Sequence, residues 1–159
     1  MSKKRKPVKT AKAVQAARPT KAAIQARLLV VDDEAEFASM IRKTLESEGY
    51  SVDTALNGTQ AIEMHRKHAY DLALVDLKMP DMTGLELLQY LKVRDKRISV
   101  VLMTAFGSLA VGIEALKKGA SDYLPKPFKL AVLSSKVQDA LTRRAKYLEE
   151  QAHSPIDEM

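Results

Sequence analysis

Five polar residues lie at or shortly after the ends of short apolar runs, and their types suit phosphate chemistry: Asp32, Asp33, Asp76, Thr104 and Lys126. Three carboxylates held close together repel one another unless a proton or a cation neutralises part of their charge. Oxygen ligands without His or Cys favour Mg²⁺, which binds few carboxylates and leaves a position for a phosphate oxygen. A lysine adds positive charge beside the same phosphoryl group, and a threonine adds a hydrogen bond. These residue types predict a Mg²⁺-dependent phosphoryl-transfer site, which works mostly by positioning and charge neutralisation.

The elements that must position these residues alternate between short apolar runs and amphipathic stretches, five times from Leu28 onward. This alternation is typical of βα units around a parallel sheet. Most of the runs are apolar on both faces, as buried parallel strands are, whereas 50–55 alternates like an edge strand. The expected strands are 28–31, 50–55, 72–75, 98–103 and 121–124. The sequence therefore predicts an α/β fold with a doubly wound, five-stranded parallel sheet.

The expected helices follow from apolar spacing and from capping residues. Asn57 and Gly58 turn the chain into the second helix, Ser108 is the expected N-cap of the fourth, and Gly119 closes that helix. Gly112 inside the fourth helix costs roughly 1 kcal/mol relative to alanine, which predicts a soft helix. The last helix is expected from about 130 to 150, with one apolar face formed by Leu130, Leu133, Val137, Leu141 and Leu148.

The polar residues fall where such a sheet binds ligands. In open parallel sheets, ligands lie outside the carboxyl ends of the strands, where the loops diverge and helix N-termini point at the crevice. The third strand is expected between the first and the fourth. Asp76 at its end would then be flanked by Asp32 and Asp33 on one side and by Thr104 and Lys126 on the other. This placement makes Asp76 the expected nucleophile.

Four segments in order, LLVVDDE, DLALVDLKMPDMTGLELL, VVLMTAF and GASDYLPKPF, resemble the signature segments of bacterial two-component response-regulator receiver domains. The resemblance covers residues 28 to about 145. The stretch TAFGSLAVGIEALKKGASDYLPKPF is most similar to receivers of the nitrogen-regulation type, whose full-length members continue into an ATPase and a DNA-binding domain. The resemblance implies a flavodoxin-like receiver fold with strand order 2-1-3-4-5, and phosphorelay signal transduction.

The resemblance also implies roles for the acidic residues and their neighbours. Asp76 would accept the phosphoryl group from a histidine kinase or a phosphotransfer protein, with small acyl phosphates as substitutes. Asp32, Asp33 and Asp76 would bind Mg²⁺ together with the backbone carbonyl of Lys78. Lys78 and Phe106 occupy the positions that modulate water attack on the phosphoaspartate, and the bulky Phe106 predicts a long-lived phosphorylated state. A half-life of seconds would count against that expectation.

Further roles are implied on the other side of the site. Thr104 and Lys126 would bind the phosphoryl oxygens, and the peptide bond between Lys126 and Pro127 would be cis. Tyr123 would be the aromatic switch that turns inward when Thr104 moves. The output would be a changed surface around the fourth helix, fifth strand and last helix, read by a downstream protein or by a second copy of the chain. The protein would then be a switch that catalyses only its own phosphorylation and dephosphorylation.

Charge divides the 159-residue chain into a basic arm, 1–27, a receiver domain, 28–151, and a frayed end, 152–159. The arm contains nine of the 26 Lys and Arg residues and no acid, which leaves 17 cations against 20 acids in the remainder. The arm has too few large apolar residues to fold, so it is expected to be disordered. Two interpretations stay open for it: a solvated extension, or a contact with nucleic acid, an acidic protein surface or anionic lipid.

The absence of cysteine excludes disulfides and thiolate chemistry. The apolar runs are far shorter than the ~20 residues of a membrane span, so we expect no span and a cytoplasmic protein. The strand-end pair Asp32 and Asp33 also has a purely structural reading, as a helix cap and a solvated acid. His65 and His68 are spaced for a metal but lack a third ligand, which favours a structural role.

Two rival functions stay open. The first is an aspartyl-nucleophile phosphatase, which usually has a second acid two residues after the nucleophile, where this sequence has Lys78. The second is a scaffold that presents a receiver fold without phosphorylation. The presence of all five site residues argues against the scaffold.

Overall fold

The sheet in the computed structural model, which describes residues 26–105 and 109–152, has five parallel strands in the order β2-β1-β3-β4-β5. The predicted fold class and strand order are confirmed. The strands are β1 (Arg27–Val31), β2 (Ser51–Ala55), β3 (Leu72–Asp76), β4 (Ser99–Thr104) and β5 (Asp122–Pro125). Strand β1 begins at Arg27, one residue before the expected start, and Ala26 beside it is buried. Most of the predicted arm, residues 1–25, lies outside the described residues.

Burial explains why the apolar runs became the central strands. Every residue of β3 and β4 is buried, and so are the last four residues of β1. Strand β2 lies at one edge and has a mixed pattern of buried and exposed residues, as its alternating sequence predicts. The register pairs Val31 with Val75 and Asp76 with Met103, so these three strands end close together.

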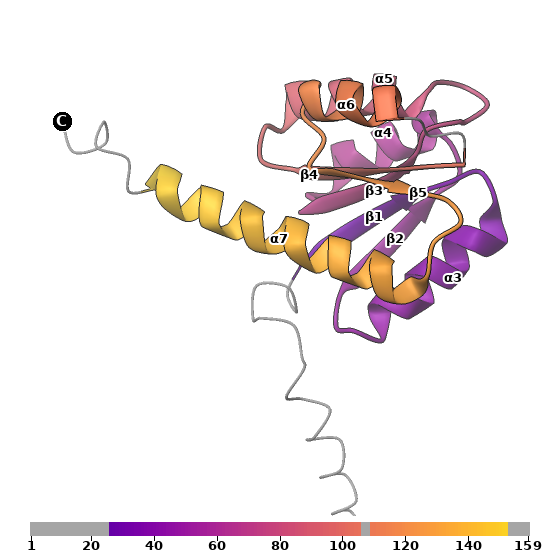
Figure 1. Ribbon diagram of the computed structural model, residues 1–159, viewed down its shortest axis with the longest axis horizontal. Helices are drawn as coiled ribbons and strands as arrows, with labels where there is room; N and C mark the ends of the chain where they lie inside the picture. The colour runs from indigo at the N-terminus through magenta and orange to yellow at the C-terminus, as the bar shows by residue number, and fades with distance from the viewer. Residues whose placement is uncertain (1–25, 106–108, 153–159) are drawn as a thin grey trace, which may run out of the picture.

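Helices cover both faces of the sheet (Figure 1). One face packs against α3 (Ala35–Glu46) and α7 (Leu130–Ala152), through a core that includes Ile41, Leu74 and Val137. The other face packs against α4 (Gly58–Lys67), α5 (Gly84–Arg94) and α6 (Leu109–Lys117), through a core that includes Val75 and Leu88. This arrangement is the predicted doubly wound sheet.

Helix α7 is longer than the part that packs. Leu133, Val137 and Leu141 are buried, whereas Leu130, which the spacing places on the same face, is 38% exposed. Leu130 is the first residue of α7 and lies almost one turn before the stretch that enters the core. Leu148 is half-buried, and the yellow end of the helix in Figure 1 extends past the sheet.

The helix termini follow the capping chemistry of the sequence. The Asn57 side chain accepts a hydrogen bond of 2.7 Å from the backbone N–H of Gln60 and caps α4. Gly119 follows α6 with a φ of +105°, a conformation that glycine adopts without the strain of a side chain. Ser108, the expected cap of α6, lies outside the described residues.

Candidate functional site

The acidic residues converge at the carboxyl edge of the sheet. Asp32 directly follows β1 and is fully buried, and Asp76 is the last residue of β3 and is 7% exposed. Asp33 is exposed, and one carboxylate oxygen from each of the three residues lies within 4.8 Å of the others. Thr104, the last residue of β4, is buried at the same edge. The structure therefore brings together the residues that the strand-end argument selected.

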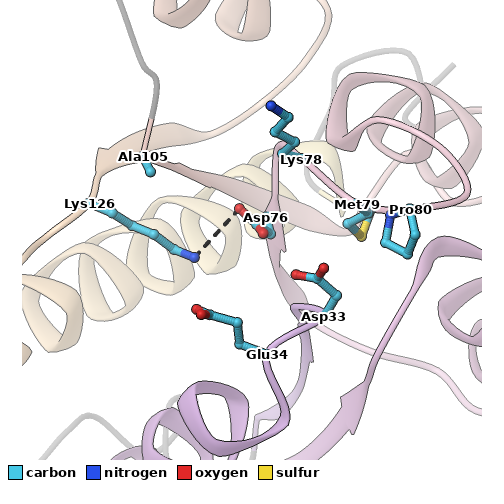
Figure 2. A pocket seen from close by; sticks show the side chains of 8 residues that line it. All are labelled: Asp33, Glu34, Asp76, Lys78, Met79, Pro80, Ala105 and Lys126. Carbon is cyan, nitrogen blue, oxygen red and sulfur yellow. Dashed lines mark ion pairs between the residues drawn. The ribbon is translucent and has the colours of Figure 1, made fainter.

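Lys126 reaches this cluster from the loop after β5. Its Nζ lies 2.7 Å from Oδ2 of Asp32 and 3.6 Å from Oδ1 of Asp76, the contact drawn as a dashed line in Figure 2. Its backbone N–H donates to the carbonyl of Thr104 at 2.8 Å, which ties the loop to the end of β4. The Lys126–Pro127 peptide is cis, as the resemblance implies.

A pair of aromatic rings lies beneath this lysine. The Nζ of Lys126 is 4.4 Å from the centroid of the Phe37 ring, a cation–π distance, and Phe37 in turn lies 5.8 Å from Phe128. Phe37 was not singled out as a site residue, because its spacing on α3 indicates only a core position. The structure shows that it also contacts the amine that serves the site.

The charge in the cluster is not balanced by the lysine alone. The pKa of Asp76 is raised to about 6, first by burial and then by the neighbouring charges of Asp32 and Asp33, although Lys126 and the N–H of Lys78 act to lower it. A bound cation would neutralise part of the negative charge of these neighbouring carboxylates, and a donor set made only of oxygen atoms fits Mg²⁺. Within residues 26–105 and 109–152, this is the only group of three potential metal ligands, and it does not include His65 or His68.

The cluster opens into a pocket of about 460 Å³. Its lining residues, shown in Figure 2, are Asp33, Glu34, Asp76, Lys78, Met79, Pro80, Ala105 and Lys126. The side chain of Lys78 is exposed and points away from Asp76. Glu34 was not among the predicted site residues, although its place directly after two aspartates is a signal for it. The backbone N–H of Glu34 donates to Oδ1 of Asp32 at 2.9 Å and so orients that carboxylate.

Tyr123 on β5 is half-buried and lies against α6. A Cβ atom added to Gly112 would lie 2.9 Å from Cδ2 of the Tyr123 ring, closer than packed atoms tolerate. Gly112, which the sequence marks as a soft point in the helix, therefore also makes room for this ring. Phe106, the residue expected to slow water attack, lies outside the described residues.

Residues 28–138 match the response regulator receiver domain family, and the chain belongs to that family. It is accordingly a signalling protein of the phosphorelay type. None of the helices in the described part of the chain has the length and hydropathy needed to cross a membrane.

Individual relatives agree with this assignment. The transcriptional regulatory protein TctD of Salmonella typhimurium is 39% identical over 119 residues, which are 75% of this chain and 53% of TctD. The structure of NtrX from Brucella abortus superposes with a TM-score of 0.77 at 27% identity, over 82% of this chain and 30% of NtrX. The beryllofluoride-activated NtrC4 receiver domain dimer gives 0.71 at 31% identity, over 74% and 98%. These neighbours support the likeness to nitrogen-regulation-type receivers, and the chain spans about half the length of TctD.

Proposed function

We propose that Asp76 accepts a phosphoryl group from a histidine kinase or a phosphotransfer protein, and that the phosphorylated chain signals through a changed surface. The observation that carries this proposal is the convergence of three carboxylates within 4.8 Å, with the Lys126 amine between Asp32 and Asp76. A buried, partly uncompensated cluster of this kind costs stability, so a role in binding a cation and a phosphoryl group explains it.

Transfer of the phosphoryl group from the donor to Asp76 is a nucleophilic substitution at phosphorus. A carboxylate oxygen of Asp76 forms the new P–O bond while the P–N bond of the donor phosphohistidine breaks, and the departing imidazole nitrogen takes up a proton. Mg²⁺, held by Asp32, Asp33, Asp76 and the backbone carbonyl of Lys78, supplies positive charge at the phosphoryl oxygens when it is bound.

Lys126 and Thr104 bind the phosphoryl oxygens in this proposal. The 3.6 Å between Nζ of Lys126 and Asp76 leaves this amine within reach of a group attached to Asp76. Its stronger contact with Asp32 at 2.7 Å holds it in place before phosphorylation. The bulky Phe106 is proposed to hinder the attack of water on the acyl phosphate, which would make the phosphorylated state long-lived.

The proposed output surface is formed by α6, β5 and α7. Helix α6 exposes three apolar side chains on this side of the molecule: Leu109 at 79%, Ile113 at 44% and Leu116 at 50%. Tyr123, packed on Gly112, connects β5 to this helix and is the proposed switch residue. A downstream protein or a second copy of the chain would read the surface, in line with the dimer of the activated NtrC4 receiver.

One experiment separates the switch from its two rivals. The protein is incubated with Mg²⁺ and acetyl phosphate, and its intact mass is measured over time. The switch predicts gain of one phosphoryl group in wild type and none in Asp76→Asn. A control substitution of an acid outside the pocket, Asp95→Asn, should leave the gain unchanged. Continuous hydrolysis of acetyl phosphate would support the phosphatase, and no gain in wild type would support the scaffold.

The basic arm keeps its two interpretations, a solvated extension or a contact with an acidic partner, and nucleic acid is the probe that separates them. Binding of duplex DNA is measured at two salt concentrations, with and without residues 1–25. Electrostatic binding must weaken steeply with salt and disappear with the arm. The deletion stops at 25 because Ala26 is buried and Arg27 belongs to β1. Equal binding by the two proteins would exclude this role.

A further inference from the structure

The loop between β3 and α5, residues 77–83, carries Lys78 and is closed tightly at its base. The backbone N–H of Leu77 donates to the carbonyl of Met103 at 2.8 Å, and the N–H of Gly84 donates to the carbonyl of Leu77 at 2.7 Å. A Cβ atom on Gly84 would lie 2.6 Å from the carbonyl oxygen of Asp76. The backbone of the loop therefore returns to within contact distance of the phosphorylation-site strand.

The far side of the same loop is held by Asp81. Its Oδ1 accepts a hydrogen bond of 3.0 Å from the N–H of Gly58, and its Oδ2 accepts bonds from the N–H of Thr59 at 2.7 Å and from the Thr59 hydroxyl at 2.6 Å. Gly58 and Thr59 are the first residues of α4, whose N–H groups have no partner within the helix. The hydrogen bond from Thr59 and those from the backbone lower the pKa of Asp81 to about 2, so this carboxylate is ionised throughout the neutral range.

An apolar side-chain contact adds to the hydrogen bonds that Asp81 makes with α4. A Cβ atom on Gly58 would overlap with the side chain of Met82, so this methionine lies directly against the start of α4. Met79 and Met82 also pack against the core beneath α4 and α5. The loop is thus fixed to α4 through Asp81 and Met82, although more than twenty residues separate the two segments.

We infer that Asp81 is a positioning residue for the phosphorylation site, because it fixes the loop that presents the Lys78 backbone to the carboxylate cluster. The inference rests on the proposed Mg²⁺-dependent function. Lys78 lies three residues before Asp81, its N–H donates to the Asp76 carboxylate, and it lines the pocket. Without Asp81 the loop would keep its base at Gly84 and the Met82 contact, but it would lose the three hydrogen bonds that join it to α4. The Lys78 carbonyl would then spend less time facing the metal position.

Asn57 provides a matched control, because its side chain caps the same helix through the N–H of Gln60, whereas Asp81 binds the helix from the loop. The test compares Asp81→Ala and Asn57→Ala with wild type by calorimetric titration with Mg²⁺. Asp81→Ala should weaken Mg²⁺ binding about tenfold, the lower end of what loss of a supporting group costs a metal site. Asn57→Ala should destabilise α4 and leave the Mg²⁺ Kd unchanged. Asp81→Asn keeps one acceptor oxygen, so its Kd for Mg²⁺ should lie between those of Asp81→Ala and wild type. This variant also provides the test if Asp81→Ala does not fold.

A second readout needs no metal. Hydrogen exchange of the metal-free proteins should become faster at residues 77–84 in Asp81→Ala and stay slow there in Asn57→Ala. Equal Mg²⁺ Kd values for wild type and the Asp81 variants, or an equal loss in Asn57→Ala, would overturn the positioning role alone. No Mg²⁺ binding by wild type would overturn the proposed function, and the inference with it.

Discussion

Carboxylates at the two ends of the sheet are paired with positive groups to very different degrees. At the carboxyl end, burial and neighbouring acids raise the pKa of Asp76 to about 6, and Lys126 and the backbone N–H of Lys78 offset them only in part. Asp53 on β2 contacts residues at the amino ends of β1 and β3; partial burial would raise its pKa, but the hydrogen bonds from Tyr70 and Arg27 lower it overall. The Tyr70 hydroxyl donates at 2.6 Å and the Arg27 guanidinium at 3.0 Å.

A second paired acid completes the amino end. The carboxylate of Asp71 accepts a bond of 2.8 Å from the backbone N–H of Arg27 and lies 3.1 Å from the Arg144 guanidinium. The Nε of Arg144 also donates to the carbonyl of Arg97 at 2.6 Å, so α7 is tied to the loop before β4. The amino end pairs both acids with cations, although Nε of Arg27 is buried without a hydrogen-bond partner. The carboxyl end leaves negative charge unmatched, which suits the binding of a cation and a phosphoryl group.

The largest effect is expected from removing the carboxylate of Asp53. Asp53→Ala should lower the free energy of unfolding at pH 7 by roughly 2 kcal/mol, because a charged acceptor with two donors is lost. An acid whose pKa is lower in the folded state stabilises the folded protein at pH values above its pKa in the unfolded chain. This contribution is lost as the pH falls through the pKa of the folded state. Urea denaturation followed by circular dichroism should therefore show a smaller gap between variant and wild type near pH 3. A constant gap would contradict the assigned charge state.

The opposite sign is expected at the carboxyl end. Asp76→Asn should raise the free energy of unfolding of the metal-free protein at pH 8 by about 1–2 kcal/mol, because it removes an uncompensated buried charge. Because the folded pKa of Asp76 is raised, ionisation of this residue does not destabilise the wild type below the unfolded pKa. The free energy of unfolding of the wild type then falls as pH rises through about 6. The gain should therefore be absent near pH 4. If Asp76→Asn were less stable than wild type in EDTA at pH 8, the contrast between the two ends of the sheet would be wrong. Addition of Mg²⁺ should stabilise the wild type more than the variant.

The smallest effect is expected from Arg144. Arg144→Gln should cost roughly 1 kcal/mol, because its side chain is 18% exposed and pairs with Asp71. Arg143 is the matched control: its side chain is 56% exposed and its ion pair with Asp122 spans 3.9 Å. Arg143→Gln should change the thermal midpoint less than Arg144→Gln does. Equal shifts would mean that the amino-end network contributes no more than an ordinary surface pair.

The elements of the fold could be predicted because each depends on local pattern. Mostly apolar runs identified β3 and β4, alternation identified the edge position of β2, and the capping residue Asn57 placed the start of α4 at Gly58. The spacing placed Leu130 on the apolar face of α7, but spacing alone does not show where the packed length of a helix begins, and Leu130 is 38% exposed.

The site residues that could be predicted are those whose place depends on the ends of strands. Asp32, Asp76 and Thr104 are fixed by the strand ends that carry them, so the strand-end argument found them. Phe37 was not found, because a helical apolar position gives no sign that a lysine from the other end of the domain will lie 4.4 Å above the ring. Asp81 was not found as a cap for α4 either, because its partners are more than twenty residues away in the sequence.

The sequence by itself determined which residues stand at which ends of which strands, because periodicity and composition are local properties of the chain. The tertiary structure decided how the charges pair. It placed the Lys126 amine closer to Asp32 than to Asp76, and it gave Asp53 two donors. Pairing depends on the directions and reach of side chains from segments far apart in the sequence, and these are fixed only when the helices pack on the sheet.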